Sequence, residues 1–418
     1  MATWTVHLEG GPRRVNHAAV AVGTRIFSFG GYCSGEVTDE KDPLDVHVLD
    51  TVNYRWIKMQ PRYMHAGEIF EQTQIDENDE KHGQTVPFQR YGHTAVEYDG
   101  RAYVWGGRND DYGACNLMHE FDPEHCLWRK VEVNGYVPPS RDGHTAVVWN
   151  HQMFVFGGFE EESQRFSQET YVFDFATSTW RELATRNTPP MWRDFHTASV
   201  IDGTMYIFGG RSDHGGQFHT AHDLYDDTLM ALNLTSGEWT KLEVEGTRPG
   251  GRRSHSTWVF DGKMFMFGGY LGTRNVHYNE LYCFDPKRVS WTVIAVHGAY
   301  PTARRRHCSV VSNGKVFLFG GTMPNPSVNC AGHVSGFFNN IAAPSGLADL
   351  SDLHVLDFSP SLKQLAMQTV ILGLKVPSSN MFDTLQNDVP YDLRYEMYCQ
   401  VTPNTVATSG NYRNEQSG

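Results

Sequence analysis

Several features are scarce in this chain, and each scarcity excludes a class of protein. The 418 residues contain only seven cysteines, which are scattered and include no Cys-x-x-Cys pair. We therefore expect neither a disulfide framework nor a cysteine zinc site. No apolar run approaches the roughly 20 residues of a membrane span, and the first segment, MATWTVHLEGGPRR, lacks the apolar core of a signal peptide. These absences predict a protein of the cytoplasm, or also of the nucleus.

Basic charge is scarce as well. The chain has 35 Lys and Arg against 48 Asp and Glu, which gives a formal net charge of -13. General binding to nucleic acid or to an anionic membrane needs a basic face, so we expect neither as a direct partner.

What the chain has in abundance is a repeat of about 50 residues. Six times, Arg-x-x-His is followed by Gly-Gly, whose first glycine lies thirteen residues after the histidine. Short apolar strands at such a period indicate a β-propeller. The histidine–glycine pairs are His17–Gly30, His93–Gly106, His144–Gly157, His196–Gly209, His255–Gly268 and His307–Gly320.

One repeat, residues 252–270, illustrates the expected blade. Residues 255–260 and 264–267 read as two strands, and Asp261-Gly262 between them is typical of a two-residue hairpin turn. The paired glycines suit a place where backbones approach too closely for a Cβ atom. A third strand ends in Asp or Asn, and a tryptophan six residues later would open the outer strand and pack between blades. These tryptophans are Trp56, Trp128, Trp180, Trp239 and Trp291.

The sixth repeat lacks this tryptophan. Lys363 stands six residues after Asp357, whereas TWTVHLEGG, with Trp4, is similar to SWTVIAVHG, with Trp291. We predict that the segment around Trp4 supplies the outer strand of the last blade, which removes open sheet edges. The predicted fold is an all-β, six-bladed propeller over residues 1–358, with insertions at 61–86 and 323–350 that we expect to be mobile surface loops.

After residue 358 the pattern becomes helical. Ser359 suits a helix cap, Pro360 a first helical position and Gly373 a stop. Periodicity alone leaves open whether the helices of residues 359–400 pad the propeller or bind a partner. A disordered tail is expected over 401–418. The helical faces are Leu362, Ala366 and Val370 in the first helix, and Pro390, Leu393 and Met397 in the second.

One face of the disc is the expected binding surface. The first two strands of each blade are antiparallel, so residues around Arg-x-x-His and residues just after Gly-Gly share an edge. The arginine and histidine occur in every blade, which favours a structural role over a metal site. We expect no metal, cofactor or catalytic residue. Residues that break the sixfold pattern are the candidates for binding.

Basic groups gather on this face in the fourth to sixth blades. Guanidinium groups can bind a carboxylate bidentately, with roughly 1.5–3 kcal/mol for each charge-assisted bond. A solvated basic rim is the alternative reading. The candidates for a ligand carboxylate are Arg211, Arg253, Ser254, Arg305 and Arg306.

Acidic and aromatic residues at matching positions could hold a basic side chain of the same ligand. Asp142 and Asp194 could instead pair with neighbouring arginines. The candidates for this second pocket are Asp142, Asp194, Asp110, Glu160, Tyr91, Trp192 and Tyr270.

The repeats resemble the kelch repeat over residues 1–358. SLKQLAMQTV resembles an elongin-binding BC box, although Ala366 stands where cysteine is usual, and VPYDLRYEM resembles a cullin-2 box. Taken together, the chain resembles the kelch-repeat substrate receptors of cullin-2–RING ubiquitin ligases.

The resemblance implies a non-catalytic receptor. Elongin B/C would bind Leu362, Ala366 and Val370, and cullin-2 with its RING subunit would bind at Pro390, Leu393 and Met397. Substrates would carry C-terminal degrons ending in glycine, preferably after Arg, Lys or Gln, and would be ubiquitinated and degraded by the proteasome. Two other readings stay open: a kelch scaffold for chromatin or cytoskeletal partners without ligase activity, and an oxidase, which would need an irregular His/Tyr/Cys metal cluster.

Overall fold

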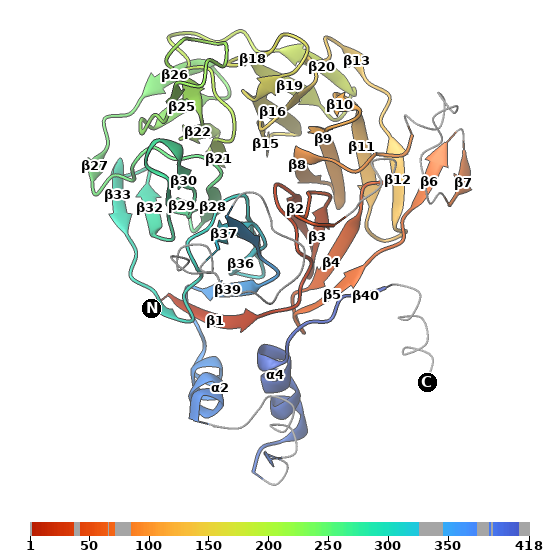
Figure 1. The fold of residues 1–418 in the computed structure, drawn as a ribbon, viewed down its shortest axis with the longest axis vertical. Helices are drawn as coiled ribbons and strands as arrows, with labels where there is room; N and C mark the ends of the chain where they lie inside the picture. Colours follow the sequence, from red (N-terminus) through yellow and green to blue (C-terminus); the bar gives the residue numbers. More distant parts are fainter. Residues whose placement is uncertain are drawn as a thin grey trace, which may run out of the picture.

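The computed structural model describes residues 2–36, 42–65, 67–71, 85–325, 346–373, 384–385 and 388–408. Six sheets in this part of the chain contain four successive antiparallel strands, and they stand around a common axis like the blades of a propeller (Figure 1). The innermost strands of neighbouring blades contact one another in a closed cycle, in the order β2, β8, β15, β21, β28, β35 and back to β2. The predicted all-β propeller is confirmed.

The strands of the first three blades follow the expected order from axis to rim. They are β2 (Ala18–Val22), β3 (Arg25–Phe29), β4 (Val46–Asp50) and β5 (Arg55–Lys58) in blade one, β8 (Tyr91–Tyr98), β9 (Arg101–Asn109), β11 (Met118–Asp122) and β12 (Leu127–Lys130) in blade two, and β15 (Thr145–Trp149), β16 (Gln152–Phe156), β19 (Thr170–Asp174) and β20 (Thr179–Glu182) in blade three.

The other three blades repeat this order, and the last takes its outer strand from the other end of the chain. They contain β21 (Thr197–Ile201), β22 (Thr204–Phe208), β25 (Met230–Asn233) and β26 (Glu238–Lys241) in blade four, β28 (Ser256–Phe260), β29 (Lys263–Phe267), β32 (Leu281–Asp285) and β33 (Ser290–Val293) in blade five, and β35 (Cys308–Ser312), β36 (Lys315–Phe319), β39 (Leu353–Asp357) and β1 (Thr3–Leu8) in blade six.

Turn residues and paired glycines have the predicted conformations. Asp261 and Gly262 both have positive φ, at 48° and 65°, as a two-residue hairpin turn requires. Gly30 also has positive φ, and a Cβ atom there would lie 2.7 Å from the carbonyl oxygen of Arg90 in the next blade. The glycine pair therefore permits the close approach of neighbouring blades.

The six tryptophans pack between blades, and Trp4 closes the ring. Trp4 is 1% exposed and lies edge-on to Phe267 of blade five, with ring centroids 6.0 Å apart. Its strand β1 pairs antiparallel with β39, with Trp4 opposite Leu356 and Leu8 opposite Leu353. The predicted closure by the N-terminal strand is confirmed.

A short parallel strand covers the outer edge of most blades. The segment that leads into a blade supplies it: β6 (Arg62–His65) pairs with β12, β13 (Asn134–Gly135) with β20, β27 (Glu245–Gly246) with β33, and β34 (His297–Gly298) with β1. In blade one, β40 (Ala407–Thr408) takes this position beside β5. The prediction of a disordered tail over 401–418 is therefore corrected for residues 401–408. Residues 409–418 lie outside the described residues.

Two helices lie next to each other beyond the rim, beside β1 (Figure 1). They are α2 (Leu362–Gly373) and α4 (Tyr391–Val401). Met367 and Met397 are buried between them together with Leu385. The Ser361 hydroxyl accepts a hydrogen bond from the backbone N–H of Gln364 at 3.1 Å, so Ser361 caps α2 in place of the predicted Ser359.

Both insertions contain strands at their ends. In the first, β6 and β7 (Glu68–Phe70) form a hairpin whose Tyr63 is buried in the core, and in the second, β37 (Thr322–Pro324) pairs with β38 (Leu347–Asp349). The prediction of mobile loops over their whole length is therefore corrected for these ends. Residues 72–84 and 326–345 lie outside the described residues. Neither described helix is long and apolar enough to cross a membrane.

Candidate functional site

The repeated arginines are buried and bind within their own blades. In five blades the guanidinium donates to the carbonyl of the first glycine of the pair, as Arg193 does to Gly209 at 2.7 Å. Arg14 instead binds Asp45 and Glu36. The sixfold arginine is therefore structural, as its repetition predicted.

The repeated histidines link neighbouring blades. In four of them Nε2 lies 2.8–2.9 Å from the hydroxyl of the residue that follows the previous repeated histidine, as in the pair Thr197–His255. Burial and the nearby repeated arginine lower the pKa of His17, His93 and His255 to about 3, and those of the other three well below the ordinary value. The six imidazoles are therefore neutral at physiological pH.

The residues that precede these histidines form a closed ring of hydrogen bonds. Each backbone N–H donates to the carbonyl of the corresponding residue in the previous blade, at 2.7–3.1 Å, until the sixth carbonyl accepts from the first residue. All six have positive φ. This ring was not predicted from the sequence, although glycine at two of the positions was a signal. In ring order, they are Asn16, Gly92, Gly143, Phe195, Ser254 and Arg306.

An axial cavity of about 130 Å³ is lined only by these six residues and the six histidines. The histidines repeat, so the six ring residues alone make the cavity differ from one blade to the next. Arg306 stands opposite Gly143, three steps around the ring. The wall at Gly92 and Gly143 has no side chain, whereas the wall at Arg306 carries a cation.

The non-repeating positions above the ring are cross-strand neighbours. In each blade, the residue after the repeated arginine pairs with the residue after Gly-Gly, so the two sets of positions do share one face. The pairs are Val15–Tyr32, Tyr91–Arg108, Asp142–Phe159, Asp194–Arg211, Arg253–Tyr270 and Arg305–Thr322.

Three candidate arginines lie together in blades five and six. Among the described residues, no carboxylate lies within ion-pair distance of Arg253, Arg305 or Arg306. The Tyr270 ring lies between two of them, with its centroid 3.9 Å from the guanidinium carbon of Arg305 and 5.7 Å from that of Arg253. Arg306 donates to the Tyr32 hydroxyl at 2.6 Å. This group of cations has no anion of its own within the described structure.

Burial makes this charge costly. Arg305 is only 9% exposed, and desolvation together with Arg306 and Arg253 lowers its pKa to about 10. The His277 ring packs against Tyr270 at a tilt of 46°, with ring centroids 4.6 Å apart, and burial, Arg305 and Arg306 lower the pKa of His277 to about 4. An anion bound here would relieve the repulsion. His277 was missed, because nothing in its spacing points to this face. Tyr32 follows Gly30-Gly31, so its place on this face was predictable, but it was not among the candidates for binding.

Arg211 and Ser254, the other candidates for binding the carboxylate, have different surroundings from these three arginines. Both oxygens of the buried Asp194 accept from Arg211, at 3.1 and 2.5 Å, so Arg211 is held within the fold. The alternative reading of Asp194 as an arginine partner is confirmed. Ser254 lies in the ring and lines the cavity.

Two predicted acids of the second pocket also have partners. The buried Glu160 binds Arg141 and Arg165, each at 2.8 Å, so its placement in a ligand pocket is corrected. Asp110 is exposed and accepts from the Tyr91 hydroxyl at 2.9 Å, which places this pair at the surface of the face.

Asp142 is the exception among these acids. It is 6% exposed, and in the described part of the chain its carboxyl group has no hydrogen bond or ion pair. One of its oxygens lies 3.3 Å from where a Cβ atom of Gly92 would stand, at the edge of the axial cavity. Burial and the nearby Asp194 raise the pKa of Asp142 to about 7.

Of the aromatic candidates, Tyr270 contacts the arginines and Trp192 does not line the axial cavity. Tyr270 packs on the arginines and donates to Asn275 at 3.0 Å. Trp192 is half-buried next to Arg193 and does not line the axial cavity.

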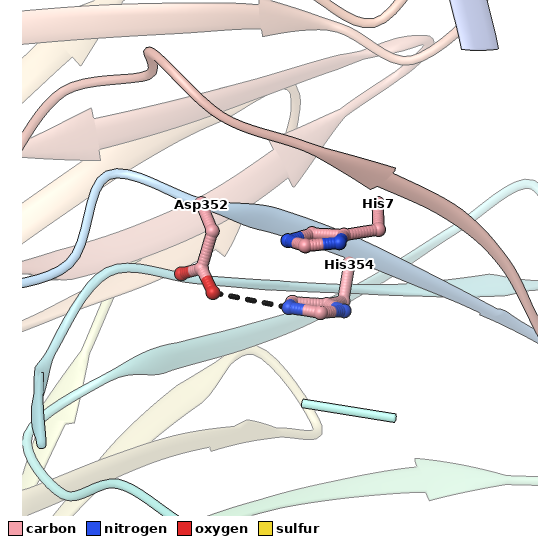
Figure 2. Close-up of side chains that lie close together, drawn as sticks. All are labelled: His7, Asp352 and His354. Atoms are coloured by element: carbon pink, nitrogen blue, oxygen red, sulfur yellow. Dashed lines mark hydrogen bonds and ion pairs between the residues drawn. The ribbon is translucent and has the colours of Figure 1, made fainter. Parts of the chain in front are cut away.

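One cluster in blade six, which does not line the axial cavity, has residues that commonly bind metals. His354 Nε2 lies 3.0 Å from Asp352 Oδ2, and His7 stacks on His354 with ring centroids 4.3 Å apart (Figure 2). Both Asp352 oxygens also accept from the buried Arg304, at 2.7 and 2.6 Å. The guanidinium neutralises the carboxylate, so this cluster is part of the hydrogen-bond network that holds blade six.

The two helices expose different kinds of surface. Leu362, at 86% exposed, lies with Ala366 and Val370 on the open face of α2, as the spacing predicted. In α4, however, Met397 is 2% exposed and Leu393 is half-buried against α2.

The predicted partner contact of α4 is therefore corrected. Met397 and Leu393 hold the two helices together, and only Pro390 of the predicted set is exposed. Tyr391 and Tyr395, whose rings are nearly parallel, form the open face of α4 instead. Two residues four apart define a face of a helix but not what that face contacts, so the burial of Leu393 and Met397 could not be predicted from their spacing.

Comparisons with known proteins agree with this architecture. Residues 92–321 match the KLHDC2/KLHL20/DRC7 Kelch-repeats domain. Kelch domain-containing protein 3 of Bos taurus is 39% identical over 408 residues, and that of Homo sapiens is 39% identical over 407 residues; each alignment covers 97% of this chain and 98% of the relative. Acyl-CoA-binding domain-containing protein 4 of Arabidopsis thaliana is 26% identical over 327 residues, which cover 76% of this chain and 45% of that protein.

Proposed function

This chain belongs to the kelch-repeat family, and from that membership we propose that it is the substrate-recognition subunit of a cullin-2–RING ubiquitin ligase. It would bind proteins that end in glycine and present them for ubiquitination and proteasomal degradation. Kelch-repeat proteins are generally non-catalytic, and this role needs no catalytic residue, cofactor or metal in the chain. The location in the cytoplasm, or also in the nucleus, stays a prediction.

The observation that carries the proposal is the group of three arginines without carboxylate partners beside the axial cavity. A C-terminal carboxylate would supply the missing anion to Arg253, Arg305 and Arg306, with roughly 1.5–3 kcal/mol for each charge-assisted bond. A cavity of about 130 Å³ favours a terminal residue without a side chain. Glycine is that residue.

The opposite side of the face would read the preceding residue. Asp142, without a partner among the described residues, lies beside Gly92, and the hydrogen-bonded pair Tyr91 and Asp110 lies on the same face. An acid there would favour Arg or Lys before the glycine, and oxygen acceptors would also accommodate Gln.

The surface of α2 supports the ligase part of the proposal. Leu362, Ala366 and Val370 form an exposed apolar stripe, which suits a helix that docks into the groove of a partner. We propose that elongin B/C binds this stripe. Cullin-2, with its RING subunit, would then meet the exposed start of α4 at Pro390, Tyr391 and Tyr395.

Peptide binding tests the first part. A peptide ending in Arg-Gly should bind at least about tenfold more tightly than the same peptide amidated at its C-terminus, because amidation removes the charge that the arginines bind. Arg305→Gln should cause a similar loss, whereas Arg181→Gln, on the exposed outer strand β20, should cause none. Equal binding of acid and amide would rule out the carboxylate site.

Co-purification tests the second part. Elongin B/C should co-purify with the chain and be lost on Leu362→Ser, which removes an exposed apolar contact without disturbing the fold. The matched control is Val52→Ser, which changes an exposed apolar residue at 70% exposure on the propeller. If neither change affects co-purification, or elongin B/C never binds, the scaffold role for chromatin or cytoskeletal partners takes the place of the ligase role.

A further inference from the structure

Asp142 differs from every other buried acid on the binding face. Asp194 is neutralised by Arg211, and Glu160 by Arg141 and Arg165. Asp142 is also buried, at 6% exposed, yet none of the described residues pairs with its carboxyl group. A buried acid without a partner destabilises a fold, so its presence beside a cavity points to a partner supplied by a ligand.

The position of Asp142 gives the ligand's direction. Its carboxyl group lies against Gly92, which lines the axial cavity. Its neighbour Gly143 stands opposite Arg306 in the ring. A ligand whose terminal carboxylate reaches Arg306 would extend its preceding side chain across the cavity toward Asp142.

We propose that Asp142 makes recognition of this preceding side chain proton-linked: the free protein holds a proton on the carboxyl group, and a cationic side chain of the ligand displaces it. The proposal rests on the function proposed above and adds its chemistry. When the ligand binds, the Asp142 O–H bond breaks and the proton goes to solvent. The carboxylate that remains binds the guanidinium or ammonium group of the ligand. Nothing is oxidised or reduced.

The charges around Asp142 explain why a proton would be held. Asp194, on the neighbouring blade, repels the charged form, and Glu161 adds to this repulsion. The cations Arg108 and Arg211 oppose it, but each binds other acids, Arg108 with Glu161 and Arg211 with Asp194.

Tyr91 also faces this carboxyl group, and its own pKa is raised, so it stays neutral. Together with burial, these groups set the pKa of Asp142 near 7. The proton is therefore present in slightly acidic medium and absent in slightly alkaline medium.

The protonation of Asp142 determines which ligands the protein prefers at each pH. Below about pH 7 a cationic ligand must displace a proton, so its affinity should fall about tenfold per pH unit. A neutral side chain of the same shape has no such requirement, and a protonated Asp142 can donate a hydrogen bond to it. The protein should therefore discriminate for basic residues more strongly as pH rises toward 8.

Titration of the full chain with two peptides tests this. The peptides are acetylated and identical except that one ends in Arg-Gly and the other in citrulline-Gly, a neutral isostere, so the contribution of the terminal carboxylate cancels. Affinity for Arg-Gly should rise about tenfold or more between pH 5.5 and 7 and then level off, whereas affinity for citrulline-Gly should not rise. Calorimetry in buffers of different ionisation enthalpy should show close to one proton released per Arg-Gly peptide at pH 6. Equal pH profiles for the two peptides would overturn the proposal.

Asp142→Asn provides the residue-level test. It should flatten the Arg-Gly profile and weaken Arg-Gly at pH 8 while leaving citrulline-Gly within about threefold. Glu162→Gln, which removes the same charge from the exposed turn between β17 (Phe159–Glu160) and β18 (Arg165–Phe166), should keep the wild-type profile. If Asp142→Asn retains the pH dependence, another group carries the proton and the proposal is wrong.

A stability measurement separates this proposal from the proposed function. The Asp142 pKa is raised in the folded state, so its ionisation costs stability increasingly as pH rises from about 4 through 7. Asp142→Asn should therefore raise the unfolding temperature more at pH 8 than at pH 5. If Asp142→Asn raises the unfolding temperature in this way but no peptide binds, the receptor function is wrong, and only the raised pKa of Asp142 is confirmed. If peptides bind but Asp142→Asn brings no pH-dependent gain, only the proton linkage fails.

Discussion

Arg304 and Arg305 are neighbours in sequence, and their surroundings are opposite. Arg304 belongs to the repeat, is fully buried and binds both oxygens of Asp352. Arg305 points to the binding face, is almost as buried, and has no carboxylate partner among the described residues. The same division separates Glu160, which two arginines bind, from Asp142. Arg304 and Glu160 are paired within the fold, as Arg211 and Asp194 are on the same face, whereas Arg305 and Asp142 have no charged partner among the described residues.

The largest test of this comparison exchanges the two arginines for alanine. Arg304→Ala leaves the buried Asp352 without its cation and should cost about 3–5 kcal/mol of unfolding free energy. Arg305→Ala removes a desolvated and repelled cation, so it should cost less than about 1 kcal/mol or increase stability. Urea unfolding of both variants measures this, and equal losses would show that the two arginines do not differ in kind.

The next test compares two tryptophans. Trp4→Ala removes a fully buried ring from the closing strand and should cost roughly 3–5 kcal/mol. Trp192→Ala, on the half-buried residue before Arg193, should cost less than half as much. Thermal unfolding gives the order, and a reversed order would mean that β1 is not essential for closing the ring.

A smaller effect is expected from two glycines of blade three that both have positive φ. Gly157 belongs to the repeat, and a Cβ atom there would lie 2.8 Å from the His196 ring and 2.9 Å from the Arg193 carbonyl oxygen. At Gly143, in the ring, the nearest atom would be Asp194 Cβ at 3.2 Å. Gly157→Ala should cost roughly 2–4 kcal/mol and Gly143→Ala about 1–2 kcal/mol, since only the first forces backbone to move.

The smallest expected effect is the dependence of the unfolding free energy on pH. His17, His93 and His255 have folded-state pKa values of about 3, below the ordinary 6.5, so the unfolded chain binds more protons between these values. Stability should therefore fall as pH drops below about 6.5 and continue to fall toward pH 3. His255→Gln should lower this slope by up to about 1.4 kcal/mol per pH unit. An unchanged slope would mean that His255 is charged in the fold.

Much of the fold was predictable because the distances between repeated residues determine where the strands lie. The distance from histidine to Gly-Gly predicted the blades, and the missing tryptophan predicted the closure by Trp4. The candidate site was predicted less well, because its chemistry depends on which charges meet. Arg211 and Arg305 look alike in sequence, but Asp194 faces the first across the strand pair and Thr322 faces the second. The cross-strand register contained that information, and applying it would have removed Arg211 from the candidates.

The face of α4 could not be predicted in this way. Leu393 and Met397 mark one side of the helix, and a helix with polar and aromatic residues on its other side can dock in either direction. Their burial is decided by Met367 of α2 and by Leu385, contacts that the spacing within α4 does not show.

The closure of the ring by β1 has a consequence for the timing of folding. Thr3 pairs with Asp357, so β1 is synthesised about 350 residues before its partner strand. At roughly 5–20 residues per second, it waits about 20–70 s on the ribosome without the neighbour that covers Trp4. The helices α2 and α4 follow directly after that neighbour. A chain that presents α2 and α4 has therefore already made β39, so the order of synthesis ensures that the ring can be closed before the two helices emerge.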